Sequence, residues 1–362
     1  MIDNLQILRA VASYLVFLTH YGLYIGPVLP RPDLLAFGAF GVDVFFVLSG
    51  FIMFVSTSGR RESPGGFLLR RASRVVPVYW LVTIGLALIA LTGLKPIGIM
   101  EVRPDYLIQS LLFLPFSRGG FIEPLNSVGW TLNYEMFFYV IFAGLLLVPK
   151  PAVRALGAAA IFLALILLGL LPVPGLYWAY YTKPIIIEFA AGIGLGYAYL
   201  RLGIPPAGFP VRRLACAALS AAALLVLGGQ IATTLLDASP ELSGFARPLV
   251  WGSAAVLVVG AMLLLEQGGV ALKSRWLLSQ GNASYSFYLV HNLLLHIAAK
   301  LAALLVAPGY ARAALIFGIA FPASVAAGEV LFRYVETPLI AGLRHRLHRR
   351  TRPASQPTPI AS

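Results

Sequence analysis

Ionisable side chains interrupt the apolar segments in the N-terminal part of this sequence. Arg9 and His20 lie in the first segment, Asp43 lies in the second, and Glu135 lies in a later one. Such groups are costly inside hydrocarbon, so each is expected to face the interior of a helix bundle and to mark a site or a pathway. Residues eleven apart on an α-helix differ by about 20° in rotation and about 16 Å in height. Arg9 and His20 are therefore expected to share one helix face.

His20 is the candidate for acid–base chemistry. If successive segments cross a membrane in alternate directions, His20, Asp43 and Glu135 reach a similar depth near the outer face. An imidazole beside a carboxylate is held in one tautomer and gains basicity, which suits removal of a proton from a hydroxyl group. We predict that His20 is a general base and that Glu135 or Asp43 orients its ring. A polar contact between helices without a catalytic role is the alternative interpretation.

Arginines cluster before the third long apolar segment, at Arg70, Arg71 and Arg74. A guanidinium group binds phosphate through two parallel hydrogen bonds, and Arg9 is a permanent charge within hydrocarbon that requires an anionic partner. We predict that these four arginines bind an anionic ligand. The alternative is that the cluster only sets topology and contacts lipid headgroups.

Other polar residues in the apolar segments are candidates for contact with a substrate. Ser49, Asn133 and Tyr288 are predicted to stabilise the oxyanion that forms when a hydroxyl group attacks a substrate carbonyl. His291 follows several hydroxyl groups in one segment, where pore lining and hydrogen bonding between helices are both open. No set of ligand residues has a spacing typical of metal sites, so no metal is predicted.

The segments that position these residues are too apolar for a soluble protein. Of the 362 residues, 59% are apolar and 11% are charged, whereas soluble proteins have roughly a quarter charged residues. Apolar runs long enough to cross roughly 30 Å of hydrocarbon predict an all-α integral membrane protein with about ten transmembrane helices. These runs lie near 5–25, 37–57, 75–94, 130–149, 153–171, 184–200, 213–231, 248–266, 284–306 and 312–334.

Two shorter features are assigned differently. The run 106–116 is too short to cross and is predicted to be interfacial or re-entrant. Gly192, Gly194 and Gly196 resemble a nucleotide-binding loop only in spelling, because they lie within an apolar run with no strand before it. We predict that they allow close helix packing.

The formal net charge of +13 is carried by short clusters between the apolar runs, so nucleic-acid binding is not predicted. Lys and Arg are concentrated on one set of alternate loops, which predicts that both termini are cytoplasmic. We expect a membrane domain over 1–343 and a basic, disordered cytoplasmic tail over 344–362 that contacts anionic lipid. The expected location is the inner membrane of a bacterium, with the site opening toward the outer face.

Several of these elements occur together, and in order, in a known family. The chain has Arg9 ten residues before His20, the segment Phe45-Phe46-Val47-Leu48-Ser49-Gly50-Phe51, the Arg71 and Arg74 pair, Trp130 to Glu135, Ser284 to His291, and Glu336-Thr337-Pro338. In these features it resembles the acyltransferase-3 family of polytopic membrane enzymes, which move acyl groups from acyl-CoA to sugars of surface polysaccharides. The resemblance implies that His20 is catalytic, that Arg9, Arg71 and Arg74 serve the donor site, and that Glu135 is a functional acid.

Together, the residues and the resemblance predict transfer of an acetyl group from cytoplasmic acyl-CoA to a hydroxyl of an exopolysaccharide sugar. Acyl-CoA is a co-substrate, and no permanently bound cofactor is expected. Expected partners are membrane lipids, a polysaccharide or lipid-linked sugar acceptor, and a second copy of the chain. The connection 95–129, with Tyr106, and the neighbouring Trp130 are the expected acceptor platform, because sugars stack on aromatic rings.

Two alternatives stay open at this point. Direct attack on the thioester and an acyl-histidine intermediate are both compatible with these residues. The same His, Asp and Glu side chains suit a proton relay in a transporter or flippase.

Overall fold

The computed structural model describes residues 2–26, 32–60, 62–92, 102–118, 121–235 and 242–342, which are helical almost throughout. Strands β1 (Ser117–Arg118) and β2 (Phe121–Ile122) form a small antiparallel pair. The predicted tail 344–362 lies outside the described residues. The all-α fold predicted from the apolar runs is confirmed.

The long helices are α1 (Asp3–Ile25), α2 (Phe40–Thr57), α3 (Pro64–Leu91), α5 (Trp130–Leu145), α6 (Pro151–Leu168), α8 (Ile187–Leu202), α9 (Val211–Leu235), α10 (Ser253–Gln267), α11 (Arg275–Leu305) and α12 (Tyr310–Leu331). Shorter turns extend or join them: η1 (Pro32–Ala39), α4 (Pro104–Leu111), η3 (Ser127–Gly129), α7 (Leu176–Tyr181), η4 (Pro184–Ile186), η5 (Pro248–Gly252) and η6 (Phe332–Glu336). Several begin with proline at the first turn, where its missing N–H costs nothing.

Eight helical segments of the described chain are long and apolar enough to cross a membrane: Asp33–Thr57, Pro64–Leu91, Pro151–Leu168, Pro184–Leu202, Val211–Leu235, Pro248–Gln267, Arg275–Leu305 and Tyr310–Gly342. The other two predicted spans are helices too, α1 and α5. Helix α1 is not among the eight because polar residues such as Arg9 and His20 lower its hydropathy. Helix α5 is not among them because its 16 residues, about 24 Å of helix, are too few. A multi-pass membrane fold is therefore clear, and ten crossings stays a prediction.

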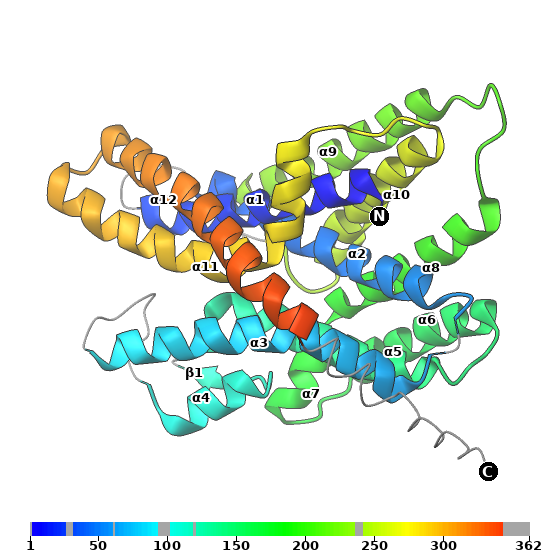
Figure 1. Cartoon of the computed structure of the whole chain (residues 1–362), viewed down its shortest axis with the longest axis horizontal. Coiled ribbons are helices and arrows are strands. Elements are labelled where there is room, and N and C mark those ends of the chain that lie inside the picture. Colours follow the sequence, from blue (N-terminus) through cyan, green and yellow to red (C-terminus); the bar gives the residue numbers. More distant parts are fainter. Residues whose placement is uncertain are drawn as a thin grey trace, which may run out of the picture.

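Figure 1 shows α3, α4, α5, α6 and α7 on one side of the molecule and α1, α9, α10, α11 and α12 on the other, with α2 and α8 between them. Stacked aromatic rings connect the middle helices α2 and α8 to α5. The ring of Phe189 on α8 stacks on Phe46 of α2 and on Phe138 of α5, with centroids 4.5 Å apart in both pairs. This packing holds the inner faces of α2 and α5 toward each other.

Glycine allows the two middle helices to touch along their backbones. A Cβ atom on Gly192 of α8 would lie 2.1 Å from the carbonyl oxygen of Val47, and one on Gly50 of α2 would lie 2.1 Å from that of Phe189. The predicted role of this glycine run in close helix packing is confirmed for Gly192. Gly194 lies on another face of α8, where a Cβ atom would meet no neighbouring atom within 4 Å.

Alanine at Gly192 and at Gly194 tests the backbone contact between α2 and α8. We expect Gly192→Ala to lower the free energy of unfolding by about 1–3 kcal/mol, because the methyl group forces α2 away from α8. Gly194→Ala, the matched control, should leave stability unchanged or raise it by up to about 1 kcal/mol, since alanine is the better helix former. Thermal unfolding in detergent measures both, and equal effects at the two positions would contradict the assigned packing.

Candidate active site

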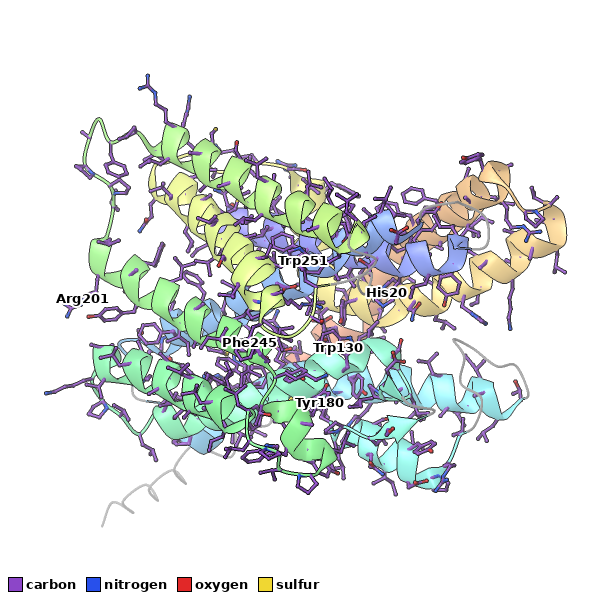
Figure 2. All side chains as sticks on the ribbon, turned by 180° about the vertical axis from the view of Figure 1, so that it is seen from behind. His20, Trp130, Tyr180, Arg201, Phe245 and Trp251 are labelled. Carbon is purple, nitrogen blue, oxygen red and sulfur yellow. The ribbon has the colours of Figure 1, made fainter. Side chains whose placement is uncertain are left out.

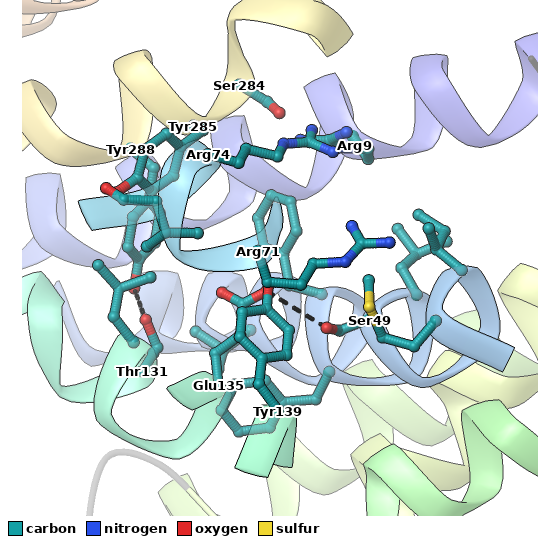
Figure 3. Close-up of a pocket in the computed structure, with 18 residues that line it drawn as sticks. Arg9, Ser49, Arg71, Arg74, Thr131, Glu135, Tyr139, Ser284, Tyr285 and Tyr288 are labelled. Atoms are coloured by element: carbon teal, nitrogen blue, oxygen red, sulfur yellow. Dashed lines mark hydrogen bonds between the residues drawn. The ribbon is translucent and has the colours of Figure 1, made fainter. Parts of the chain in front are cut away.

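Two neighbouring cavities lie inside the helix bundle. The inner cavity, of about 110 Å³, is lined by residues of α1, α2, α3, α5 and α11 (Figure 3). The end cavity, of about 490 Å³, is lined by both ends of the membrane domain, including Ile2 and Ala341. Arg9, Ile52 and Arg74 belong to the walls of both cavities. A ligand that enters the end cavity therefore meets the inner one past two guanidinium groups.

Three of the four predicted arginines line the inner cavity. Helix α3 begins at Pro64, earlier than the predicted span, because the Ser63 hydroxyl accepts a hydrogen bond from the backbone N–H of Gly66 and caps the first turn. Arg71 and Arg74 therefore lie on the helix, three residues apart on one face. Figure 3 shows Arg9 and Arg74 reaching toward each other from α1 and α3.

Arg70 is separated from this group. Its position, one residue before Arg71, turns it about 100° around the helix axis. It forms an ion pair with Glu62, and its side chain is 48% exposed. Unlike the three others, Arg70 is not a wall residue of either cavity.

Two carboxylates face the arginines. Glu135 on α5 accepts hydrogen bonds from the hydroxyl groups of Tyr139 and, at 3.3 Å, Ser49. Glu336 accepts a hydrogen bond of 2.7 Å from Ser286 and lines the end cavity. It is buried and is the last residue of the π-helical turn η6. Among the described wall residues, three arginines thus face two carboxylates, which leaves a net positive charge.

Asp43 has a different partner from the one expected. Its carboxylate accepts two hydrogen bonds from Arg247, from Nε at 3.2 Å and from the terminal nitrogen at 2.9 Å. Asp43 is fully buried and Arg247 nearly so. Arg247 also lies over the ring of Trp251. The expectation that Asp43 orients His20 is therefore corrected: the carboxylate belongs to an ion pair that ties α2 to the start of η5.

His20 contacts another imidazole rather than a carboxylate. Its Nδ1 atom lies 3.1 Å from Nε2 of His291 and 3.0 Å from the carbonyl oxygen of Val16. His20 lies on α1, where Figure 2 labels it, and its partner His291 lies on α11. The predicted similarity in depth does not bring Glu135 to His20, because depth along a helix does not fix the rotation of its side chains. Glu135 faces the arginines instead.

Tyr288 connects the histidines to the inner cavity. Its side chain lines that cavity, while its backbone carbonyl oxygen lies 2.8 Å from Nδ1 of His291. The Tyr288 hydroxyl bonds with Thr131 at 2.9 Å and with the carbonyl oxygen of Val128 at 3.1 Å. His20 itself is not a wall residue of these two cavities.

Of the remaining residues predicted to contact a substrate, one lines the inner cavity and two do not. Ser49 lines the inner cavity, as Tyr288 does. Asn133 is buried, and Trp130 begins α5, where its carbonyl oxygen accepts a hydrogen bond of 2.8 Å from Tyr180 (Figure 2). Neither of these two residues lines the cavities.

The sequence reasoning missed Tyr139 and Arg247. Tyr139 follows Glu135 by four residues, a spacing that brings side chains together on a helix and could have indicated the contact. Arg247 lies 204 residues from Asp43, and its position just before an apolar run is the only local signal. Glu329, whose partner the sequence did not indicate, bonds with Ser279, Gln280 and Arg333.

Comparison with known families places the chain in a class. Residues 2–329 match the family described as an acyltransferase domain. The chain therefore belongs to this acyltransferase family, and its apolar helices make it a multi-pass membrane member.

Curated relatives agree with this class. The chain is 37% identical to the exopolysaccharide production protein ExoZ of Rhizobium meliloti (strain 1021), over 85% of this chain and 92% of the relative. It is 30% identical to the acyltransferase MdmB of Streptomyces mycarofaciens, over 89% of this chain and 85% of the relative. Nodulation protein 10 of Rhizobium leguminosarum bv. viciae is 29% identical over 45% of this chain and 48% of the relative. No solved structure matches the chain significantly.

The pair between Asp43 and Arg247 predicts a loss of stability on mutation. Asp43→Ala should lower the free energy of unfolding by about 3–5 kcal/mol, because it leaves the buried guanidinium group without its carboxylate. The double variant Asp43→Ala with Arg247→Met should recover part of that loss, since the guanidinium group is removed together with its carboxylate partner. Thermal unfolding of the single and double variants in detergent measures both effects. Additive losses would show that the two side chains do not act as a pair.

Proposed function

We propose that this protein transfers an acetyl group from acetyl-CoA to a hydroxyl group of a sugar destined for an exopolysaccharide. The observation that carries the proposal is the excess of partly buried guanidinium groups around two neighbouring cavities in a chain of the acyltransferase family. The named role of the relative ExoZ in exopolysaccharide production supports the acceptor class.

The donor is proposed to enter from the end cavity. CoA carries several phosphate charges, and guanidinium groups bind phosphates in bidentate pairs. The phosphates would bind near Arg9, Arg74 and Arg71, whose guanidinium donates a hydrogen bond to Ser56 on the wall of the end cavity. The narrow pantetheine arm would extend past these side chains toward Tyr288. The first residues of α1 and the end of the last helix line this same cavity. This supports an arrangement with both termini and the donor entrance on the cytoplasmic side of the inner membrane.

His20 is proposed to act as the general base. Its ring accepts the proton of the acceptor hydroxyl while the hydroxyl oxygen attacks the thioester carbonyl carbon. A new C–O bond forms and the C–S bond breaks, and the CoA thiolate then takes up the proton. Tyr288 and Ser49 lie on the wall of the inner cavity, where their hydroxyl groups donate to the Val128 carbonyl oxygen and to Glu135. Each hydroxyl would exchange that acceptor for a developing oxyanion.

The acceptor is proposed to contact aromatic side chains of the connection before α5. Tyr106 stacks on Phe116 with ring centroids 5.0 Å apart, and the guanidinium of Arg103 lies 4.9 Å from the Tyr106 ring. Arg103 also donates two hydrogen bonds to Asp105, which lower the pKa of that carboxyl group. Because Phe116 and the Arg103 guanidinium pack against the ring, a sugar would contact the edge and hydroxyl group of Tyr106 and the polar groups of Arg103 and Asp105 beside it.

Transfer of label from acetyl-CoA tests the reaction. Purified protein in detergent with radiolabelled acetyl-CoA should move label to an exopolysaccharide oligosaccharide. His20→Ala should reduce the rate by about 10²–10⁴-fold, the usual contribution of a general base. Its size-exclusion profile and thermal unfolding should match those of the wild type. Label that stays on CoA with every acceptor, with solute movement in proteoliposomes instead, would indicate the transporter alternative.

Neighbouring arginines test donor binding. Arg71→Gln should raise KM for acetyl-CoA by about tenfold or more, because a charged hydrogen bond to phosphate contributes about 1.5–3 kcal/mol. Arg70→Gln, one residue away but paired with Glu62 outside the cavities, should leave KM within about twofold. Steady-state kinetics with the acceptor at saturation provide the comparison. Similar KM changes in both variants would argue that the cluster acts only through its total charge.

A further inference from the structure

The proton positions on the two histidines follow from their neighbours. The carbonyl oxygen of Tyr288 can only accept a hydrogen bond, so Nδ1 of His291, 2.8 Å away, carries a proton. In a neutral ring, Nε2 of His291 is then an unprotonated acceptor. This atom lies 3.1 Å from Nδ1 of His20, which therefore donates to it. The carbonyl oxygen of Val16, 3.0 Å from the same Nδ1, also requires a proton there.

These contacts leave Nε2 of His20 as the nitrogen with a free lone pair. We propose that His291 is a positioning residue that fixes His20 in this tautomer and holds its ring for proton transfer at Nε2, the role first expected of a carboxylate. The inference rests on the proposed function, since it assigns a partner to the proposed base. His291 does not itself touch the reacting atoms in this account.

Burial makes the arrangement specific. His291 is fully buried, and its ring stacks on that of Phe287 with centroids 5.7 Å apart and an angle of 7° between the planes. A second proton on His291 would set its Nε2–H against the Nδ1–H of His20, two donors facing each other. The neutral form of His291 is therefore the one that satisfies both rings.

Close approach of two helix backbones sets the register of the pair. A Cβ atom on Gly281 of α11 would lie 2.0 Å from the carbonyl oxygen of Gln6 on α1. From this contact both helices run in the same direction until His20 meets His291. A larger residue at the crossing would shift one histidine past the other, so the pair depends on helix packing as well as on its own hydrogen bonds.

The hydrogen bond between His20 and His291 also stabilises the protonated form of His20. When Nε2 of His20 accepts a proton from the acceptor hydroxyl, the ring becomes a cation that still donates from Nδ1. The lone pair of His291 then accepts a charge-assisted hydrogen bond, which is stronger than a neutral one. A neutral acceptor gives this support without adding a second fixed charge inside the bundle.

Three substitutions at position 291 distinguish the hydrogen bond with His20 from the one with the Tyr288 carbonyl oxygen. His291→Gln keeps an acceptor near the position of Nε2, so it should retain kcat for acetyl transfer within about tenfold of the wild type. His291→Asn keeps a donor toward the Tyr288 carbonyl but does not reach His20, and His291→Phe keeps ring size and stacking without either bond. Both should lower kcat by about 30-fold or more while KM for acetyl-CoA changes less than about threefold, because a misoriented base impairs proton transfer.

Folding and base function are controlled separately. Thermal unfolding in detergent identifies any variant that fails to fold, and the comparison of Gln with Asn uses two amides that differ by one methylene. Equal kcat losses for Gln and Asn, or wild-type kcat for Phe, would overturn the positioning role of His291. Wild-type activity in His20→Ala would overturn the proposed base instead, so the two failures are distinguishable.

Discussion

The structure depends on how buried charges are neutralised inside a bundle that faces lipid. Asp43 and Arg247 neutralise each other, so they stabilise the contact between α2 and η5 and offer no charge to a ligand. The arginines around the two cavities are different, because Arg9, Arg71 and Arg74 outnumber the carboxylates that share their walls. An unbalanced charge in such a place is costly unless a ligand or water compensates for it, and this imbalance is the basis of the proposed anionic donor.

The helices were predictable because a bilayer imposes a simple requirement on sequence. A segment must be long and apolar to cross, so every predicted span corresponds to a helix, and Gly192 was recognisable as a packing residue from its apolar surroundings. The start of α3 was missed because the cap at Ser63 and Pro64 lies among polar residues, outside any hydropathy signal. This difference matters, since it places Arg71 and Arg74 on a helix face rather than in a loop.

The site was predictable as a set of residues but not as a set of contacts. Intramembrane polarity indicated His20, Asp43, Glu135 and Arg9 as interior groups. Their partners depend on helix rotation and on pairs of helices far apart in the sequence, and neither leaves a local signal. His291 and His20 are 271 residues apart, and Asp43 meets a residue from the second half of the chain. Family resemblance indicated the reaction, while the geometry replaced a carboxylate beside the proposed base with a second imidazole.

Cryo-electron microscopy of the protein with a non-transferable acetyl-CoA analogue tests the central claim most directly. The account predicts phosphate density within hydrogen-bonding distance of Arg9 or Arg74, with the arm of the ligand passing through the inner cavity and its acyl end next to Tyr288 and His20. A ligand bound elsewhere on the molecule, with these arginines neutralised only by Glu135 and Glu336, would contradict it.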